Sequence, residues 1–326
     1  MDDVQKNHLK SYGIAFYALE SKLEVDWLLN YRGGSFALKL NDDILKECKV
    51  RGVTFEIIAD IQYNKIVADI TKPEVNQDVM KLEKAPKIAV YSPKNKQPWD
   101  DAVTLVMTYA EIPYDVVYDE EILREGLSKY DWLHLHHEDF TGQYGKFWSS
   151  YQNAAWFQEY VRFNEGLAGK LGFTKVSDLK LAVALKIKNF VSQGGFMFAM
   201  CSATDSYDIA LASEGVDICE YMFDGDPINS SAQQLLDFKK SIAFEDFELI
   251  TSPNIYEFSN IDVTLGRKVP RNQDFFTLFE FSAKWDPVPT MLCQNHSQII
   301  KGFMGQTTAY KKDLIKSDVL IMGENK

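Results

Sequence analysis

The sequence has few cysteines, and they follow no regular spacing. Cys48, Cys201, Cys219 and Cys293 lie far apart, and no two of them form a C-x-x-C pair. Closely spaced pairs are the usual mark of a zinc knuckle or of a dense disulfide framework. The pattern therefore argues against both, and it does not indicate the compartment in which the protein works.

The sequence also lacks an excess of basic residues and a long apolar run. It carries 35 lysines and arginines against 47 aspartates and glutamates, which gives a formal net charge of -12. Because binding to nucleic acid needs clustered basic side chains, we expect no nucleic-acid partner. No run approaches the roughly 20 apolar residues of a membrane-spanning helix, so we expect no transmembrane segment.

The amino terminus shows no signal peptide and opens directly on a helical pattern that includes Leu9 and Leu19. We interpret this start as the product of a removed leader, with a strand lost before the helix. The localisation is left open between the cytoplasm and export, and the oligomeric state is left open as well.

Hydrophobic patterning divides the chain into two units, separated by a polar segment that contains Pro73 and Pro86. Residues 1–83 predict a small α/β unit, and residues 84–326 predict a larger one. In the small unit we expect a helix around Leu9 to Leu19, a strand at Val25–Leu29, a helix at Asp42–Val50 and a strand at Val53–Ile58.

The larger unit alternates strand and helix signals. Because parallel neighbours need long crossover connections, this alternation predicts a doubly wound, mostly parallel sheet. Residues 221–305 exceed what such a fold needs, and we expect a β-rich insertion there. The strands are expected at Lys87–Ser92, Tyr114–Tyr118, Tyr130–His137 and in the run from Gly194 to Cys201, and the clearest helices at Trp99–Ile112 and Leu179–Val191.

The apolar run from Gly194 ends abruptly at Cys201, between small residues. In α/β proteins ligands bind at the carboxyl ends of parallel strands, and a nucleophile on a tight strand-to-helix turn is presented there. The helix expected after Cys201 would lower the pKa of the thiol and offer backbone N–H groups to an oxyanion. Cys201 is therefore the first candidate for chemistry.

The strand that leads into His137 is expected beside the strand that ends at Cys201. The carboxyl ends of parallel neighbours meet at one edge of the sheet, so polar residues from both strands would gather around the thiol. The catalytic candidates are Cys201, His136, His137 and Glu138. The candidates for substrate binding are Ser202, Asp205 and Asp139.

The order of strands and helices that leads through Gly194-Gly195 into Cys201 resembles the class I glutamine amidotransferase superfamily, over residues 87 to about 211. Three stretches, Lys87–Lys94, His134–Phe140 and Lys301–Gln306, resemble more narrowly a bacterial family commonly labelled asparagine synthetase B. The resemblance implies a flavodoxin-like sheet and hydrolysis of a glutamine-type amide by a cysteine nucleophile, without a cofactor. No adenylating domain is visible, so complete asparagine synthesis is not expected.

Two features depart from the pattern of the superfamily. Where its members carry Gly-x-Cys-x-Gly, this chain has alanines at both glycine positions, Ala199 and Ala203. Where the superfamily has a downstream His-x-Glu, the only downstream histidine here is His296, which is followed by Gln298 in place of Glu and whose surroundings are typical of a turn. The resemblance therefore implies a catalytic histidine either at His136 or His137, or in a segment that follows Lys326.

The same residues also allow plainer interpretations. A cysteine at the end of a buried strand is commonly a packed small hydrophobe. The histidine cluster fits either a zinc site or a hydrogen-bonded strand edge, and since its spacing matches no metal motif we predict no metal. Asp224-Gly225-Asp226 suggests calcium, but turn chemistry explains it. The aromatic residues from Trp148 to Phe163 have the spacing of a helix that packs into a core.

Two hypotheses about function remain. In the first, the protein is an enzyme that hydrolyses a small-molecule amide, with Cys201 as the nucleophile. In the second, it keeps the fold without the activity and acts as a binding or scaffold protein with a protein partner. The fold alone does not choose between them.

Overall fold

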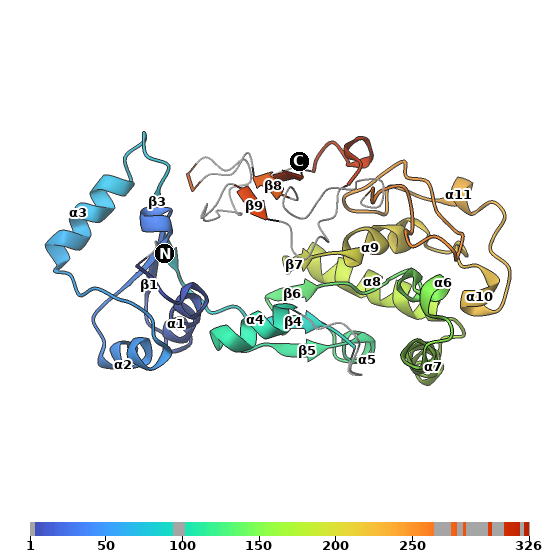
Figure 1. Cartoon of the computed structure of the whole chain (residues 1–326), viewed down its shortest axis with the longest axis horizontal. Helices are drawn as coiled ribbons and strands as arrows, with labels where there is room; N and C mark the ends of the chain where they lie inside the picture. Colours follow the sequence, from blue (N-terminus) through green and yellow to red (C-terminus); the bar gives the residue numbers. More distant parts are fainter. Residues whose placement is uncertain are drawn as a thin grey trace.

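The described residues form a four-stranded parallel sheet and two three-stranded antiparallel sheets (Figure 1). In Figure 1 the amino-terminal antiparallel sheet, drawn in blue, lies at one end of the molecule and helix α7 (Ala155–Lys170) lies toward the other. The predicted α/β class is confirmed. The computed structural model describes residues 4–93, 102–263, 275–278, 283–284, 299–301, 310–319 and 323–325.

The amino-terminal unit is a three-stranded antiparallel sheet with the strand order β2-β1-β3. Its central strand β1 (Val25–Leu29) is buried from both sides, with Val25 and Leu29 fully inaccessible to solvent. The other strands are β2 (Ser35–Leu38) and β3 (Asp78–Leu82), and the helices are α1 (His8–Glu20), α2 (Asp42–Arg51) and α3 (Asp60–Ile70). The helices predicted from Leu9 and from Asp42 are confirmed.

Local signals fix both ends of α2. The Asn41 side chain accepts hydrogen bonds from the backbone N–H groups of Asp43 and Ile44, which are otherwise unpaired at a helix start. Gly52 ends the helix with φ 69°, a left-handed conformation that glycine adopts without strain.

The predicted strand at residues 53–58 is wrong. This stretch is irregular, and Phe55 and Ile57 are 39% and 64% exposed. Aromatic and β-branched residues form a strand only where a neighbouring strand and a buried face receive them. Both sides of β1 are already paired, with β2 and with β3. The third strand is β3, which lies inside the polar segment that the sequence predicts as a linker.

The second unit contains a four-stranded parallel sheet with the strand order β5-β4-β6-β7. Its strands are β4 (Ile88–Tyr91), β5 (Asp115–Val117), β6 (Trp132–Leu135) and β7 (Phe196–Ala199). The helices between them are α4 (Ala102–Ala110), α5 (Asp119–Arg124), α6 (Trp148–Tyr151), α7 and α8 (Val176–Ser192), and α9 (Ser202–Ala212) follows β7. The predicted parallel sheet with helical crossovers is confirmed. Residues 94–101, where the predicted helix Trp99–Ile112 begins, lie outside the described residues.

Helices cover both faces of the parallel sheet. On one face, Leu133 and Leu135 of β6 share a buried cluster with residues of α5, α8 and α9, among them Leu179 and Ile187. On the other face, Met107 of α4 packs with Ile88 and with Phe16 of α1. The sheet is therefore the middle of three layers, and its strand ends are left for loops.

Helix α8 shows how the helices divide between core and solvent. It buries Leu179, Val183 and Ile187 at intervals of four residues and exposes Leu185 and Lys186. In the part of the chain that the structure describes, no helix combines the length and the apolar character needed to cross a bilayer, as the sequence predicts.

The region predicted as a β-rich insertion, residues 221–305, agrees with that prediction only in its second half, at residues 275–278 and 299–301. Residues 221–263 contain the short helices α10 (Tyr221–Asp224) and α11 (Ala232–Leu235) and isolated bridges in place of strands. Asp208 of α9 accepts the backbone N–H groups of Ile242, Ala243 and Phe244 at 2.6–2.8 Å, so a side chain supplies the acceptors that a neighbouring strand would offer. The strands β8 (Phe275–Leu278), β9 (Ile299–Lys301) and β10 (Gly323–Asn325) form a small antiparallel sheet.

The two units meet where α1 packs against α4. Gly13 of α1 approaches α4 so closely that a Cβ atom there would lie 1.8 Å from the carbonyl oxygen of Ala110. This oxygen belongs to the backbone, so relief would require the helices to separate. The contact therefore depends on glycine at this position.

We expect Gly13→Ala to lower the free energy of unfolding by about 1–3 kcal/mol, the usual range for overpacking a close contact. Gly166→Ala is the matched control. Gly166 also lies in a helix, but nothing lies within 4 Å of its missing Cβ. The control is expected to gain about 0.5–1 kcal/mol from helix propensity. Urea unfolding measures both, and a Gly13→Ala protein as stable as the control would contradict the close contact.

Candidate active site

The site is built at the carboxyl ends of β6 and β7, which the structure places side by side. Their parallel register pairs Leu135 with Ala199, so the chain leaves both strands at one edge. Ser202 Oγ then donates to the carbonyl oxygen of His137 at 2.8 Å. The expectation that the strands leading into His137 and Cys201 are neighbours is confirmed.

Cys201 has a backbone conformation that few residues other than glycine adopt. Its φ is 51° and its ψ is -139°, and it forms the N-cap of α9. A side chain in this region costs of order 1–3 kcal/mol, and such strain clusters at active sites. Ala199 and Ala203 stand where the superfamily pattern has glycines, and neither has a positive φ. Ala203 is fully buried, so its position requires a small residue but not a glycine.

The thiol of Cys201 reaches solvent, yet its pKa is raised above the usual value. Partial burial contributes most, and the charges of Asp205 and Asp262 add to it. The backbone N–H of Ser202 acts in the opposite direction but does not prevail. The expectation of a lowered thiol pKa is therefore wrong, because the surrounding carboxylates and the loss of water outweigh the helix terminus.

One backbone donor is available beside the sulfur. The N–H of Ala203 donates to Met200, and that of Thr204 donates to Cys201, within the tight turn. The N–H of Ser202 has no backbone acceptor among the described residues and points toward the sulfur, where it favours the thiolate. Ser202, predicted to bind substrate, thus offers an N–H to an oxyanion while its hydroxyl fixes the His137 loop.

The two histidines lie at the same edge but face one another. His136 Nδ1 and His137 Nδ1 are 3.1 Å apart, so one ring carries the proton between them. Among the described residues, no hydrogen bond joins an imidazole nitrogen to the sulfur of Cys201. Their roles as catalytic residues stay predictions.

Glu138 and Asp139 are buried in the loop that follows. Glu138 Oε2 accepts the backbone N–H of His136 at 3.1 Å. Asp139 accepts the N–H and the hydroxyl of Thr141, both at 2.6 Å, and the N–H of Gly145 at 3.0 Å. These contacts shape the loop. Catalysis by Glu138 and substrate binding by Asp139 stay predictions that the described contacts do not support.

Asp205, predicted to bind substrate, lies on α9 one turn after Cys201 and is 3% exposed. Burial, with the charge of Asp262 as the next cause, raises its pKa to about 8. No described lysine, arginine or histidine forms an ion pair with it. Its Oδ1 accepts the backbone N–H of Ser206 at 2.9 Å.

Three neighbours of this site were not predicted from the sequence. Asp262 raises the pKa of Cys201 and of Asp205. The phenols of Tyr256 and Tyr310 have raised pKa values, chiefly because they are buried, and the charges of Cys201, Asp205 and Asp262 add to this. All three follow Cys201 by more than 50 residues. No local pattern marks them, because only the packing of residues 250–263 and 310–319 over α9 brings them here.

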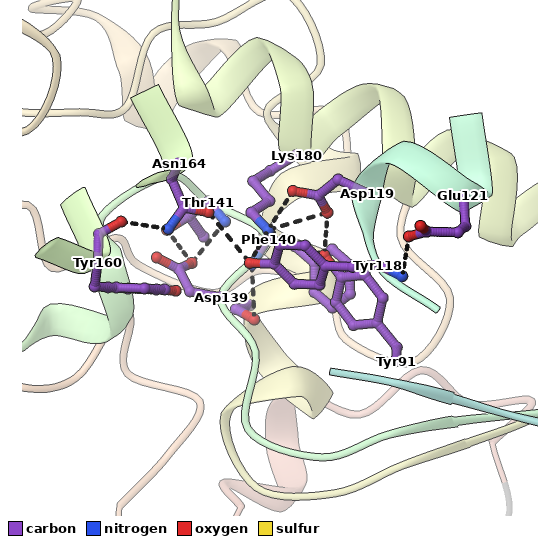
Figure 2. Close-up of polar contacts among 11 residues, drawn as sticks. Tyr91, Tyr118, Asp119, Glu121, Asp139, Phe140, Thr141, Tyr160, Asn164 and Lys180 are labelled. Carbon is purple, nitrogen blue, oxygen red and sulfur yellow. Dashed lines mark hydrogen bonds and ion pairs between the residues drawn. The ribbon is translucent and has the colours of Figure 1, made fainter. Parts of the chain in front are cut away.

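A second polar cluster lies at the ends of β4 and β5 and is shown in Figure 2. Lys180 Nζ donates to Asp119 Oδ2 at 2.8 Å and to the hydroxyl of Tyr118 at 2.9 Å. The hydroxyl of Tyr91 donates to the same carboxylate. Phe140 stacks on Tyr91 with ring centroids 5.4 Å apart. All of these side chains are buried.

This cluster fills the crevice between β4 and β6, where the strand order reverses and where doubly wound sheets usually bind ligands. Asp119 and Phe140 are 0% exposed, so side chains of the protein occupy that position. One feature of the sequence indicates this buried cluster, because Lys180 falls on the apolar face of α8 between Val176 and Val183. A lysine on such a face implies a buried partner.

Among the described residues, one group of side chains has the spacing of metal ligands, and a lysine contacts it. Oxygen or sulfur atoms of Asp217, Cys219 and Asp224 lie within 4.8 Å of one another. Lys175 Nζ contacts Asp217 at 2.6 Å and Asp226 at 2.5 Å, so an ammonium already balances the charge. Asp224 accepts the N–H of Asp226 across Gly225, which is the turn that the sequence predicts.

A cavity of about 810 Å³ lies far from the thiol along the strands. Its lining includes Leu23 after α1, Lys87 before β4 and Asp115 at the start of β5. No histidine or cysteine lines it. The cavity belongs to the amino-terminal ends of the strands, opposite to the edge that carries Cys201.

Comparisons of the chain with models of protein families, with curated proteins and with solved structures find no match.

We expect Lys180→Met to cost about 3–5 kcal/mol of stability, because it leaves the carboxylate of Asp119 buried without a cation. The double variant Lys180→Met/Asp119→Asn removes both charges and is expected to recover part of the loss. Urea unfolding of the two variants measures the difference. Losses that simply add in the double variant would show that the two side chains are not coupled.

We expect Asp205 to make stability depend on pH. The folded chain holds the Asp205 proton more tightly than the unfolded chain, so the free energy of unfolding falls as the pH rises from about 4 to about 8. Asp205→Asn should remove this fall, by an amount on the order of 5 kcal/mol at most. Urea unfolding at pH 5 and pH 8.5 tests it, and the same loss in the variant as in the unaltered protein would contradict the assignment.

Proposed function

We propose that the protein is a cysteine-dependent amide hydrolase of the class I glutamine amidotransferase-like type, with Cys201 as the nucleophile. The observation that carries the proposal is the strained backbone of Cys201 at the start of α9, at the carboxyl edge of a parallel sheet. This turn presents the thiol to solvent together with the N–H of the following residue, as nucleophile elbows do.

The order of the parallel strands supports the finer fold assignment. Numbered from β4, the order β5-β4-β6-β7 is 2-1-3-4, which agrees with the flavodoxin-like order over its first four strands. The helix α4 lies on one face and α5, α8 and α9 on the other, as that winding requires. The proposal extends to the narrower resemblance, the bacterial asparagine synthetase B family, on the three stretches quoted above.

The chemistry would proceed in two steps. The Cys201 sulfur, having lost its proton to a neighbouring base, bonds to the carboxamide carbon, and the carbonyl electron pair moves to the oxygen, which the N–H of Ser202 stabilises. Collapse of this adduct breaks the C–N bond and releases ammonia, with a proton supplied by the base. Water then cleaves the thioester and restores the thiol.

A binding or scaffold protein is the second candidate, and one observation favours it. A thiol whose pKa is raised is mostly protonated at neutral pH and is a weak nucleophile there. A group of aromatic side chains beside the site would serve a partner: Tyr256 and Tyr151 are about half exposed, and Phe147 and Trp156 connect them.

Substitution of the nucleophile separates the two candidates. We expect the unaltered protein to release ammonia from glutamine, asparagine or their N-acyl derivatives, and Cys201→Ala and Cys201→Ser to lower that rate by at least about 10³-fold. Cys48→Ala, which removes a buried thiol of the amino-terminal unit, is the matched control and should keep the rate. Circular dichroism confirms that the variants fold.

Either of two results would count against the enzyme. Activity that survives Cys201→Ala excludes this nucleophile. Absence of ammonia release by the unaltered protein, over the whole set of amides and from pH 6 to pH 10, favours the binding protein.

A further inference from the structure

Residues 54–62, which join α2 to the first turn of α3, are all exposed although several are large and apolar. Ile57 and Ile61 are 64% and 78% exposed, and Phe55 and Ile58 are each 39% exposed. Figure 1 shows α3 at the extreme end of the molecule, reached from α2 by this coil. Exposed apolar side chains so close together are typical of a surface that a partner covers. We call residues 54–62 the arm.

The backbone of the arm is also open to a partner. Residues 55–58 form no backbone hydrogen bond with the described part of the chain. Side chains hold the arm instead: Gln5 Oε1 accepts the N–H of Thr54 at 3.1 Å, and Arg32 forms an ion pair with Glu56 at 3.1 Å. Apolar side chains next to free backbone groups are what the addition of a strand to a sheet edge requires.

The amino-terminal sheet offers such an edge. In the described part of the chain, β2 is the outer strand of this sheet and pairs with β1 alone. The two residues that continue it are accessible as well, since Lys39 is exposed and Leu40 is 68% exposed. The chain therefore carries both an unpaired segment with strand-forming residues and an unpaired strand.

Charge and position favour a second copy of this chain as the partner. The arm carries the carboxylates of Glu56 and Asp60, whereas the cations of Arg32 and Lys39 flank β2 on either side. Arm and edge are neighbours within one chain, because Arg32 contacts Glu56. A two-fold axis between them brings each arm to the edge of the other copy and closes the assembly as a dimer. Pairing of the two arms with each other would instead gather four carboxylates.

We propose that the protein forms a two-fold dimer in which the arm of each copy adds to the free edge of β2 in the other. The second copy supplies what residues 53–58 lack in the single chain, which is a neighbouring strand and a face that buries Phe55 and Ile57. The contact lies in the amino-terminal unit, so the inference does not rest on the proposed function.

Sedimentation velocity of the whole chain, from about 1 µM to about 100 µM, measures the association. We expect a species with twice the mass of one chain. Ile57→Lys places a cation in the arm, opposite the cations beside β2, and should raise the dissociation constant of the dimer at least about tenfold. Leu235→Lys is the matched control. Leu235 is 51% exposed on α11, in the second unit, and its replacement should leave the constant unchanged.

Reversal of charge tests whether the arm meets the edge. Lys39→Glu and Asp60→Lys each bring like charges together, and each is expected to weaken the dimer about fivefold or more. The double variant Lys39→Glu/Asp60→Lys opposes the charges again and should recover most of the affinity. Both positions are exposed, and circular dichroism confirms that the variants keep their helices.

The outcomes decide between this dimer and its alternatives. A chain that stays monomeric at about 100 µM overturns the proposal. A dimer that Ile57→Lys leaves intact also overturns it, because another surface would then hold the copies together. Disruption by Ile57→Lys without any effect of Lys39→Glu would indicate pairing of arm with arm and contradicts the exchange. Weakening by each charge reversal, followed by recovery in the double variant, supports it, and a double variant no tighter than the single ones contradicts it.

Discussion

The parallel pairing of β6 with β7 is the contact on which the candidate site depends. It brings the loop after His137 and the turn at Cys201 to one edge, although more than 60 residues separate them in the sequence. Two serines of α9 then fasten that loop: Ser202 Oγ donates to the carbonyl of His137, and Ser206 Oγ donates to that of Glu138. Without this register, the thiol would have neither a neighbouring loop nor a fixed direction.

Much of the fold follows from local patterns, and the exceptions have a common cause. The helices predicted at Asp42–Val50 and Leu179–Val191 and the strands that lead into His137 and Cys201 carry strong signals of their own, and the structure contains them. The strand β3 was missed, and residues 53–58 were assigned as a strand, because strand pairing is decided by partners distant in the sequence. Strands were also wrongly expected at residues 221–263, where Asp208 replaces a strand as the acceptor of backbone N–H groups.

The site was predicted in its position but not in its electrostatics. The sequence indicates a helix terminus and two histidines beside Cys201, which together would favour the thiolate. It does not indicate burial, nor that Asp262 lies beside Asp205, and these raise the pKa of both the thiol and the acid. The strand order likewise points to the crevice between β4 and β6, but Lys180 and Asp119 close it. Long-range packing therefore decides which part of the carboxyl edge of the sheet is filled by side chains of the protein.

The conformation of Cys201 has a consequence for how sequence variation at this position is understood. Glycine would adopt a φ of 51° without strain and would make the folded chain more stable by about 1 kcal/mol. A residue chosen for stability alone would thus have no side chain here. The backbone strain at Cys201 is therefore a cost in stability that glycine would avoid, and stability alone does not account for a side chain at this position.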